Sequence, residues 1–181
     1  YASIHNLNQN LHKDFIQYFE EKQDVKTVLE IGCGTGIYPI RHTDLFRNVN
    51  YTGLDISNEN IDFCKQNSSF NFICGDIIQI NLNDKYDLVY SHAVIDHVYD
   101  IDRFVSKICN LTKKYAYINA YRGYFPNLKN HKMKWRDDDG CYYNDVSVSK
   151  IRQTLINNHL TETEFIIRPQ FNSNDVTQTV I

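Results

Sequence analysis

A short glycine-rich segment, placed directly after a hydrophobic strand signal, constrains this chain more than any other feature. Residues 28–36 read VLEIGCGTG and hold three of the seven glycines, at positions 32, 34 and 36. Glycines at alternate positions remove the Cβ atoms that would block a ligand, and they permit the positive φ values that a sharp strand-to-helix turn needs. The segment predicts a loop whose backbone closely approaches a large polar ligand, as in nucleotide-cofactor sites.

Size and composition are those of an ordinary folded domain. A chain of 181 residues is one domain by its length, and it can bury about two-thirds of its unfolded surface. Hydrophobic residues make up 42% of the chain and charged residues 23%, which is typical of globular proteins. The net charge of −3 argues against a broad nucleic-acid-binding surface.

The cysteines and the ends of the chain indicate a reduced, cytoplasmic protein. Five cysteines, at 33, 64, 74, 109 and 141, form no C-x-x-C pair and stand mostly in apolar patterns, so we expect free thiols in the core. No apolar run of 18 residues would span a membrane, and no signal peptide opens the sequence. The first residue is Tyr1 rather than Met, which suggests that the natural N-terminus is missing.

Strand-like and helix-like segments alternate along the chain, which is typical of a parallel sheet covered by helices. The sequence predicts an α/β, Rossmann-like, doubly wound fold: a seven-stranded, mostly parallel sheet with an antiparallel last strand and helices on both faces. The expected strands are 27–31, 51–55, 70–74, 86–90, 115–120, 164–168 and 176–181. The expected helices are 8–22, a helix from the glycine loop to 46, one from 57 to a break at 67–69, 101–111 and 148–157.

The spacing around the glycines separates two kinds of cofactor loop. A dinucleotide fingerprint needs a third glycine three residues after the second, and that position holds Ile37. Asp55 ends the second expected strand, 19 residues after Gly36, and a carboxylate there can accept hydrogen bonds from both hydroxyls of a ribose. The pair Gly75-Asp76 and the block Asp-Leu-Val at 87–89 then weigh against a nicotinamide-dependent oxidoreductase.

In this order and at these spacings, the four blocks resemble the class I S-adenosylmethionine-dependent methyltransferases over residues 26–120. The resemblance implies S-adenosyl-L-methionine as cofactor and S-adenosyl-L-homocysteine as product. It implies that Glu30 orders the loop and reaches the methionine amino group through water, that Asp55 binds the ribose diol, and that Asp76 holds the adenine amine. The implied cofactor-binding residues are Glu30, Gly32, Cys33, Gly34, Gly36, Asp55, Ile56, Asp76, Ile77 and Ser91.

We expect the sequence to contain no strong catalytic motif, because the sulfonium group of the cofactor is already activated for methyl transfer. Transfer then needs alignment of the acceptor and, for a hydroxyl or ammonium acceptor, a base. His92 and His97 are the candidates. For His97 we favour packing against a backbone carbonyl, whereas His92 is the better candidate base, with packing left open as well.

The segment after the fifth expected strand is too aromatic for a plain linker. We divide the single domain 1–181 into an N-terminal helix at 1–24, a cofactor-binding core at 25–120, an insertion at 121–147, and a C-terminal helix and strands at 148–181. The resemblance implies that the insertion builds the acceptor pocket, and a lid that packs on the body is the alternative. The candidate substrate-binding residues are Arg122, Tyr124, Trp135, Tyr142 and Tyr143. The run at 137–139 is interpreted as a solvated turn, so no metal site is expected.

The acceptor class is narrowed mainly by exclusion. Ser91-His92-Ala93-Val94 stands where methyltransferases of nucleobase amines carry Asn or Asp followed by Pro-Pro and an aromatic residue, and the chain has no Pro-Cys. We therefore expect no nucleic-acid or membrane partner. The hypothesis is a methyltransferase of a small polar metabolite, with O-methylation of a sugar or saccharide precursor favoured, in a monomer or homodimer. The alternatives are N-methylation of a small amine or amide, and a non-catalytic S-adenosylmethionine-binding partner subunit.

Overall fold

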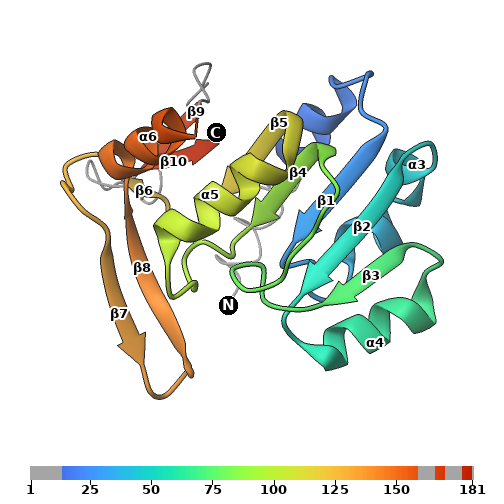
Figure 1. Ribbon diagram of the computed structural model, residues 1–181, viewed down its shortest axis with the longest axis horizontal. Coiled ribbons are helices and arrows are strands. Elements are labelled where there is room, and N and C mark those ends of the chain that lie inside the picture. The colour runs from blue at the N-terminus through green and yellow to red at the C-terminus, as the bar shows by residue number, and fades with distance from the viewer. Residues whose placement is uncertain (1–13, 159–165, 170–176, 181) are drawn as a thin grey trace.

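A five-stranded parallel sheet forms the centre of the computed structural model, which describes residues 14–158, 166–169 and 177–180 (Figure 1). Its strands are β1 (Thr27–Ile31), β2 (Asn50–Asp55), β3 (Asn71–Cys74), β4 (Tyr86–His92) and β5 (Thr112–Asn119). They lie in the order β3-β2-β1-β4-β5, and every pair is parallel. The chain runs outward from β1 to β3 and then returns to place β4 against β1. The strand order thus reverses between β1 and β4, which is where open α/β sheets bind ligands.

Helices cover both faces of this sheet. They comprise a helix at 14–20, α2 (Ile37–Arg41), α3 (Thr43–Phe46), α4 (Asn58–Asn67), α5 (Ile101–Leu111) and α6 (Val148–Asn157). Side chains cap three of them: Ser57, Asp100 and Ser147 each accept a hydrogen bond from a backbone N–H in the first turn. The single helix expected between the glycine loop and the second strand is instead two short helices, because the backbone leaves the helical region at His42, with φ −119° and ψ 45°.

Successive side chains of each strand point to opposite faces of the sheet, and this divides the core into two layers. One layer joins β1, β4 and β5 to α5 and α6, through residues that include Leu29, Val89, Ile118, Phe104 and Ile151. The other joins the same strands to the helix at 14–20, α2, α3 and α4. Its members include Phe15, Val28, Tyr38, Phe46, Tyr51, Cys64, Tyr90 and Tyr117. The sheet is therefore buried on both sides, as its apolar strands predict.

The strands after residue 120 form a second sheet, so the prediction of one seven-stranded sheet was wrong. The second sheet contains β6 (Tyr124–Phe125), β7 (Lys132–Arg136), β8 (Cys141–Ser147), β9 (Ile166–Pro169) and β10 (Thr177–Val180), in the order β7-β8-β6-β10-β9. β9 and β10 do pair antiparallel, as expected of the last two strands. They join this sheet because β6 supplies the edge on which Thr177 pairs with Tyr124. Residues 8–13 of the first expected helix and residues 164, 165, 176 and 181 of the last two expected strands lie outside the described residues.

The insertion at 121–147 is thus a folded substructure. β7 and β8 form an antiparallel hairpin, and β8 also pairs with β6 in parallel. In Figure 1 the hairpin extends past α5 in the direction in which the carboxyl ends of β1 and β2 point. Among the described residues, no helix is long and apolar enough to cross a membrane.

Candidate functional site

A cavity of about 320 Å³ opens at the carboxyl ends of β1, β2 and β3 and beneath the loop that follows β4. Its wall is mostly aliphatic, and it carries two carboxylates and two histidines. The lining residues are Ile31, Gly32, Leu54, Asp55, Ile56, Gly75, Asp76, Ile77, Ile78, His92, Ala93, Val94, His97, Val98 and Tyr99. An apolar cavity with a few convergent polar groups, at the point where the strand order reverses, is the usual form of a cofactor site in such folds.

The glycine loop turns sharply between β1 and α2, and all three of its glycines have positive φ, at 75°, 52° and 68°. The backbone N–H groups of Gly32 and Cys33 both donate to the Leu54 carbonyl, at 2.7 and 3.0 Å, which ties the loop to the end of β2. A Cβ atom on Gly34 would meet no atom within 4 Å, whereas one on Gly32 would lie 2.2 Å from Cγ2 of Val94. Gly34 therefore faces open space, and Gly32 is required by protein packing.

Asp55 joins the glycine loop to the start of α4. Its Oδ2 accepts a hydrogen bond from the Gly34 N–H at 2.8 Å, and its Oδ1 accepts from the Ser57 N–H at 2.9 Å and from the Asn60 amide at 3.4 Å. A carboxylate offers about four acceptor positions, so these bonds leave one for a ligand hydroxyl. The residue expected at the ribose also organises the protein around it.

Asp76 lies on the cavity wall with both of its oxygens engaged. Oδ1 accepts from the Ile78 N–H at 2.8 Å, and Oδ2 accepts from the Tyr99 hydroxyl at 2.7 Å. The Tyr99 oxygen in turn accepts a 2.7 Å hydrogen bond from the Gln79 amide. The hydrogen bond to Asp76 raises the pKa of Tyr99.

Tyr99 was missed by the sequence analysis, although its half-exposed ring lines the cavity beside Asp76. The available signal was an aromatic residue directly before the capping Asp100 of α5. Ile56, which the resemblance does implicate, is 72% exposed at the same cavity, whereas Ile77 is buried in the wall. An exposed isoleucine beside an aromatic ring and a carboxylate provides the surface that a flat, hydrogen-bonding heterocycle requires.

Glu30 belongs to the opposite layer of the core. Its Oε2 accepts hydrogen bonds from the hydroxyls of Tyr51 and Tyr90, the latter at 2.6 Å. Burial raises the pKa of this carboxyl group to about 8, although the two tyrosine donors act in the other direction. Two tyrosine hydroxyls thus satisfy the carboxyl group of Glu30 within the protein. The contact of Glu30 with the amino group of the cofactor stays a prediction.

Three more predicted residues lie at the ends of β1 and β4. Nδ1 of His92 lies 2.8 Å from the Tyr38 hydroxyl. Ser91 is fully buried, and its Oγ has no hydrogen-bond partner within the part of the chain that the structure describes. Cys33 is buried in the loop, and burial raises the pKa of its thiol far above the ordinary value, which fits a small packing residue.

His97 connects the cavity to the hairpin. Its Nδ1 lies 2.8 Å from the Tyr142 carbonyl oxygen, and its ring packs edge-on against Tyr143 at 5.5 Å. The backbone-carbonyl contact expected of a packed histidine is therefore present, and the residue also lines the cavity.

The other insertion residues divide into exposed and buried ones. Arg122 forms a 2.7 Å ion pair with Asp145, and both Arg122 and Arg136 lie over the Tyr143 ring. Trp135 is half-exposed on β7, with its ring edge-on to Tyr142. These side chains lie on the hairpin side of His97, where an acceptor pocket was expected.

Tyr124 requires a correction. It was expected in the acceptor pocket, but it is fully buried in the core and its hydroxyl donates to the Ile118 carbonyl at 3.0 Å. The reason is that Tyr124 lies on β6 and its side chain packs in the hydrophobic core.

Asp96 is also buried, and its carboxylate accepts hydrogen bonds from the N–H groups of Tyr121 and Arg122, at 2.7 and 2.8 Å. This residue fixes the turn after β5 to the loop after β4.

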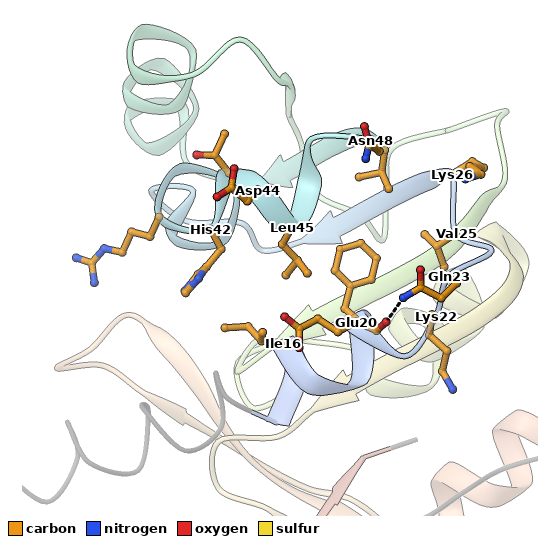
Figure 2. A pocket seen from close by; sticks show the side chains of 14 residues that line it. Ile16, Glu20, Lys22, Gln23, Val25, Lys26, His42, Asp44, Leu45 and Asn48 are labelled. Atoms are coloured by element: carbon orange, nitrogen blue, oxygen red, sulfur yellow. Dashed lines mark hydrogen bonds between the residues drawn. The ribbon is translucent and has the colours of Figure 1, made fainter.

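A larger cavity, of about 660 Å³, lies at the opposite, amino ends of β1 and β2 (Figure 2). It is an open groove between the helix at 14–20 and the α2–α3 segment. Figure 2 shows Lys22 and Lys26 pointing away from the middle of the groove, and Lys22 lies over the rings of Tyr18 and Tyr115. Because its charged groups do not converge, we assign no ligand to this groove.

Among the described residues, no three His, Cys, Asp or Glu side chains gather as a metal site would require, and all five cysteines are free.

Together, the fold, the glycine loop and the two carboxylates define a class I S-adenosylmethionine-dependent methyltransferase. The chain belongs to this family: residues 22–168 match a family model described as a methyltransferase domain. It is similar to a malonyl-[acyl-carrier protein] O-methyltransferase of Calditerrivibrio nitroreducens, with 36% identity over 92 residues that cover 50% of this chain and 36% of the relative. It is also similar to a fatty-acid O-methyltransferase of Mycolicibacterium smegmatis, with 29% identity over 51% of this chain and 35% of the relative. The matches thus span about a third of these curated relatives.

A solved structure supports the fold. The chain is similar to the magnesium protoporphyrin IX methyltransferase of Synechocystis PCC 6803, crystallised with bound S-adenosylmethionine. The TM-score is 0.67 at 17% identity, over 96% of this chain and 77% of the other. At this identity, the likeness concerns the α/β methyltransferase fold.

Proposed function

We propose that this chain is the cofactor-binding and catalytic core of an S-adenosylmethionine-dependent O-methyltransferase that acts on a small molecule. The observation that carries the proposal is the convergence of the glycine loop, Asp55 and Asp76 on one apolar cavity at the carboxyl ends of the sheet.

In this proposal the cofactor lies across the ends of β1, β2 and β3. The methionine part would lie along the loop at Gly34, where the backbone faces open space. The ribose would reach Asp55, and the adenine would lie between Ile56 and Ile77 with its amine at Asp76. These contacts follow from the family resemblance, and the positions of the two carboxylates and the two isoleucines on the cavity wall support them.

Methyl transfer by this arrangement is an in-line displacement. An acceptor oxygen forms a bond to the methyl carbon as the carbon–sulfur bond breaks, and the electron pair of that bond stays on sulfur to give neutral S-adenosylhomocysteine. A carboxylate acceptor needs no base, whereas a hydroxyl acceptor must lose a proton. His92, whose ring is held by Tyr38, is the candidate to receive that proton.

Two kinds of oxygen acceptor are consistent with the proposal. The relatives are named as O-methyltransferases of malonyl-acyl carrier protein and of fatty acids, which favours transfer to oxygen over transfer to nitrogen. The aromatic insertion, with Trp135 half-exposed, suits a sugar hydroxyl, since ring faces can stack on sugars. A cytoplasmic location and a monomer or homodimer remain predictions.

Isothermal titration of the purified chain with S-adenosylhomocysteine, with NAD as the control, tests the cofactor. Micromolar binding of S-adenosylhomocysteine alone would support the proposal, and binding of NAD instead would overturn it. Transfer of a radiolabelled methyl group to D-fucose, uridine diphosphate glucose, dodecanoate or malonyl-coenzyme A then tests catalysis. Binding without transfer to any acceptor would favour a non-catalytic cofactor-binding subunit.

A further inference from the structure

We propose that Asn119 and His92 form an acceptor subsite that binds a hydroxyl group of the molecule to be methylated. This inference rests on the proposed function and names the acceptor class for it.

The two residues are direct neighbours at the carboxyl ends of adjacent strands. His92 ends β4, Asn119 ends β5, and they occupy paired positions in the parallel ladder. Tyr90 and Tyr117 precede them by two residues and belong to the same core layer, so alternation places His92 and Asn119 on that face as well. His92 also contributes to the wall of the cofactor cavity, which makes the subsite continuous with the place where the methyl group would lie.

The Asn119 amide lacks the partners that a buried amide normally has. The residue is 1% exposed, and neither its Oδ1 nor its Nδ2 has a hydrogen-bond partner in the described part of the chain. Its backbone carbonyl accepts a hydrogen bond from the N–H of Ala93 at 3.1 Å. A buried amide without partners lowers the stability of a fold, and such groups in native proteins commonly have a functional role.

A second buried asparagine shows the contrast. Asn144 is also fully buried and its Oδ1 has no hydrogen-bond partner in the described part of the chain, but its Nδ2 donates to the carbonyls of Ile95 and Val98, at 3.0 and 2.8 Å. That amide connects β8 to the loop after β4 and has a structural role. Asn119 connects nothing through its side chain among the described residues.

The missing partners of Asn119 define the chemistry of its ligand. An amide side chain presents a donor and an acceptor together, so its best complement is a group that both accepts and donates. A hydroxyl does both, whereas a carboxylate only accepts and would leave Oδ1 unpaired. The arginines of the insertion fit this assignment, because Arg122 is already paired with Asp145 and Arg136 with Asp139.

The test compares Asn119→Leu with Asn144→Leu as the matched control. Leucine has a similar size and cannot form hydrogen bonds. Because Asn119 has no partner to lose, Asn119→Leu should raise Tm by roughly 3–8 °C, whereas Asn144→Leu, which leaves two carbonyls unpaired, should lower it. Asn119→Leu should bind S-adenosylhomocysteine within about twofold of the unsubstituted chain and lose at least tenfold in kcat/KM for D-fucose or uridine diphosphate glucose.

Two results would overturn the inference. A fall in Tm for Asn119→Leu would mean that the side chain has a structural role. Transfer only to dodecanoate or malonyl-coenzyme A would exclude the hydroxyl acceptor. Failure of the proposed function is distinct from both results, since the unsubstituted chain would then either not bind S-adenosylhomocysteine or bind it without methyl transfer to any of the four probes.

Discussion

The Tyr99 hydroxyl donates a 2.7 Å hydrogen bond to the Asp76 carboxylate and so connects the loop after β4 to the end of β3. Together with the Ile78 N–H, which donates to the other oxygen, this contact orients the Asp76 carboxylate on the cavity wall. We expect Tyr99→Phe, which keeps the ring and removes the donor, to weaken S-adenosylhomocysteine binding about 3- to 10-fold. Titration calorimetry would measure this, with Tyr86→Phe, on β4 outside the cavity, as the control. Unchanged affinity would show that Asp76 needs no support from Tyr99.

Asp55→Ala should impair both binding and stability. The role in ribose binding that the resemblance implies would affect cofactor binding alone, but the carboxylate also accepts hydrogen bonds from Gly34, Ser57 and Asn60. Cofactor affinity should fall roughly 5- to 100-fold, and the free energy of unfolding should fall by about 1–3 kcal/mol. Calorimetry and urea unfolding separate the two effects. An affinity loss at full stability would mean that the three protein donors find water instead.

Gly34→Ala and Gly32→Ala should fail in different ways. At Gly34 a methyl group enters open space, so the protein should fold with a cost of about 1 kcal/mol from the positive φ, yet lose cofactor binding by at least tenfold. At Gly32 the methyl group collides with Val94, so Tm itself should drop sharply. Thermal unfolding with and without S-adenosylhomocysteine distinguishes the two variants. Equal stability of both would contradict the packing described for Gly32.

The buried Glu30 should make stability fall as the pH rises. Its pKa is raised from 4.5 to about 8 in the folded protein, so the folded chain keeps a proton that the unfolded chain releases. This contribution is fully present below pH 4.5 and is lost as the pH passes through about 8, with a slope of up to about 1.4 kcal/mol per pH unit between these values. Glu30→Gln, which stays neutral, should flatten the pH profile of the free energy of unfolding and should be the more stable protein at pH 8. Parallel profiles for the two proteins would show that Glu30 does not titrate in this range.

Trp135 offers a direct probe of the hairpin, because it is the only tryptophan of the chain. Its ring is half-exposed on β7, away from the cofactor cavity. Trp135→Ala should therefore leave S-adenosylhomocysteine affinity within about twofold and reduce methyl transfer, since the hairpin is the expected acceptor side. In the unsubstituted chain, tryptophan emission should respond to an acceptor and not to the cofactor. An equal loss of binding and turnover in the variant would identify the hairpin as a structural lid.

Local patterns were enough to predict much of this fold. The bounds of α5 and α6 and the start of α4 directly after its cap Ser57 follow from caps and apolar spacing, and β1 follows from the apolar run before the glycines. The convergence of Asp55 and Asp76 was also predictable, since parallel strands bring their carboxyl ends to one edge. These features depend on residues close together in the sequence.

Features that depend on distant pairing were not predictable. A strand signal does not say which edge a strand joins, so β9 and β10 were assigned to the main sheet, although β6 provides their edge. Tyr124 and Tyr143 look alike in sequence, yet one is buried by β6 and the other contacts His97 on the hairpin. Tyr99 has no motif of its own, because its role comes from a hydrogen bond to a residue 23 positions earlier.

The contact between Gly32 and Val94 has a consequence for engineering. A Cβ atom at 32 would lie 2.2 Å from the valine, so the first glycine of the loop is matched to the segment after β4 rather than to a ligand alone. A chimera that imports this glycine loop into another methyltransferase should succeed only when the two segments are exchanged together. The glycine loop and the segment after β4 would then have to be transferred as one unit, and a substitution at Val94 would change which side chains position 32 can accommodate.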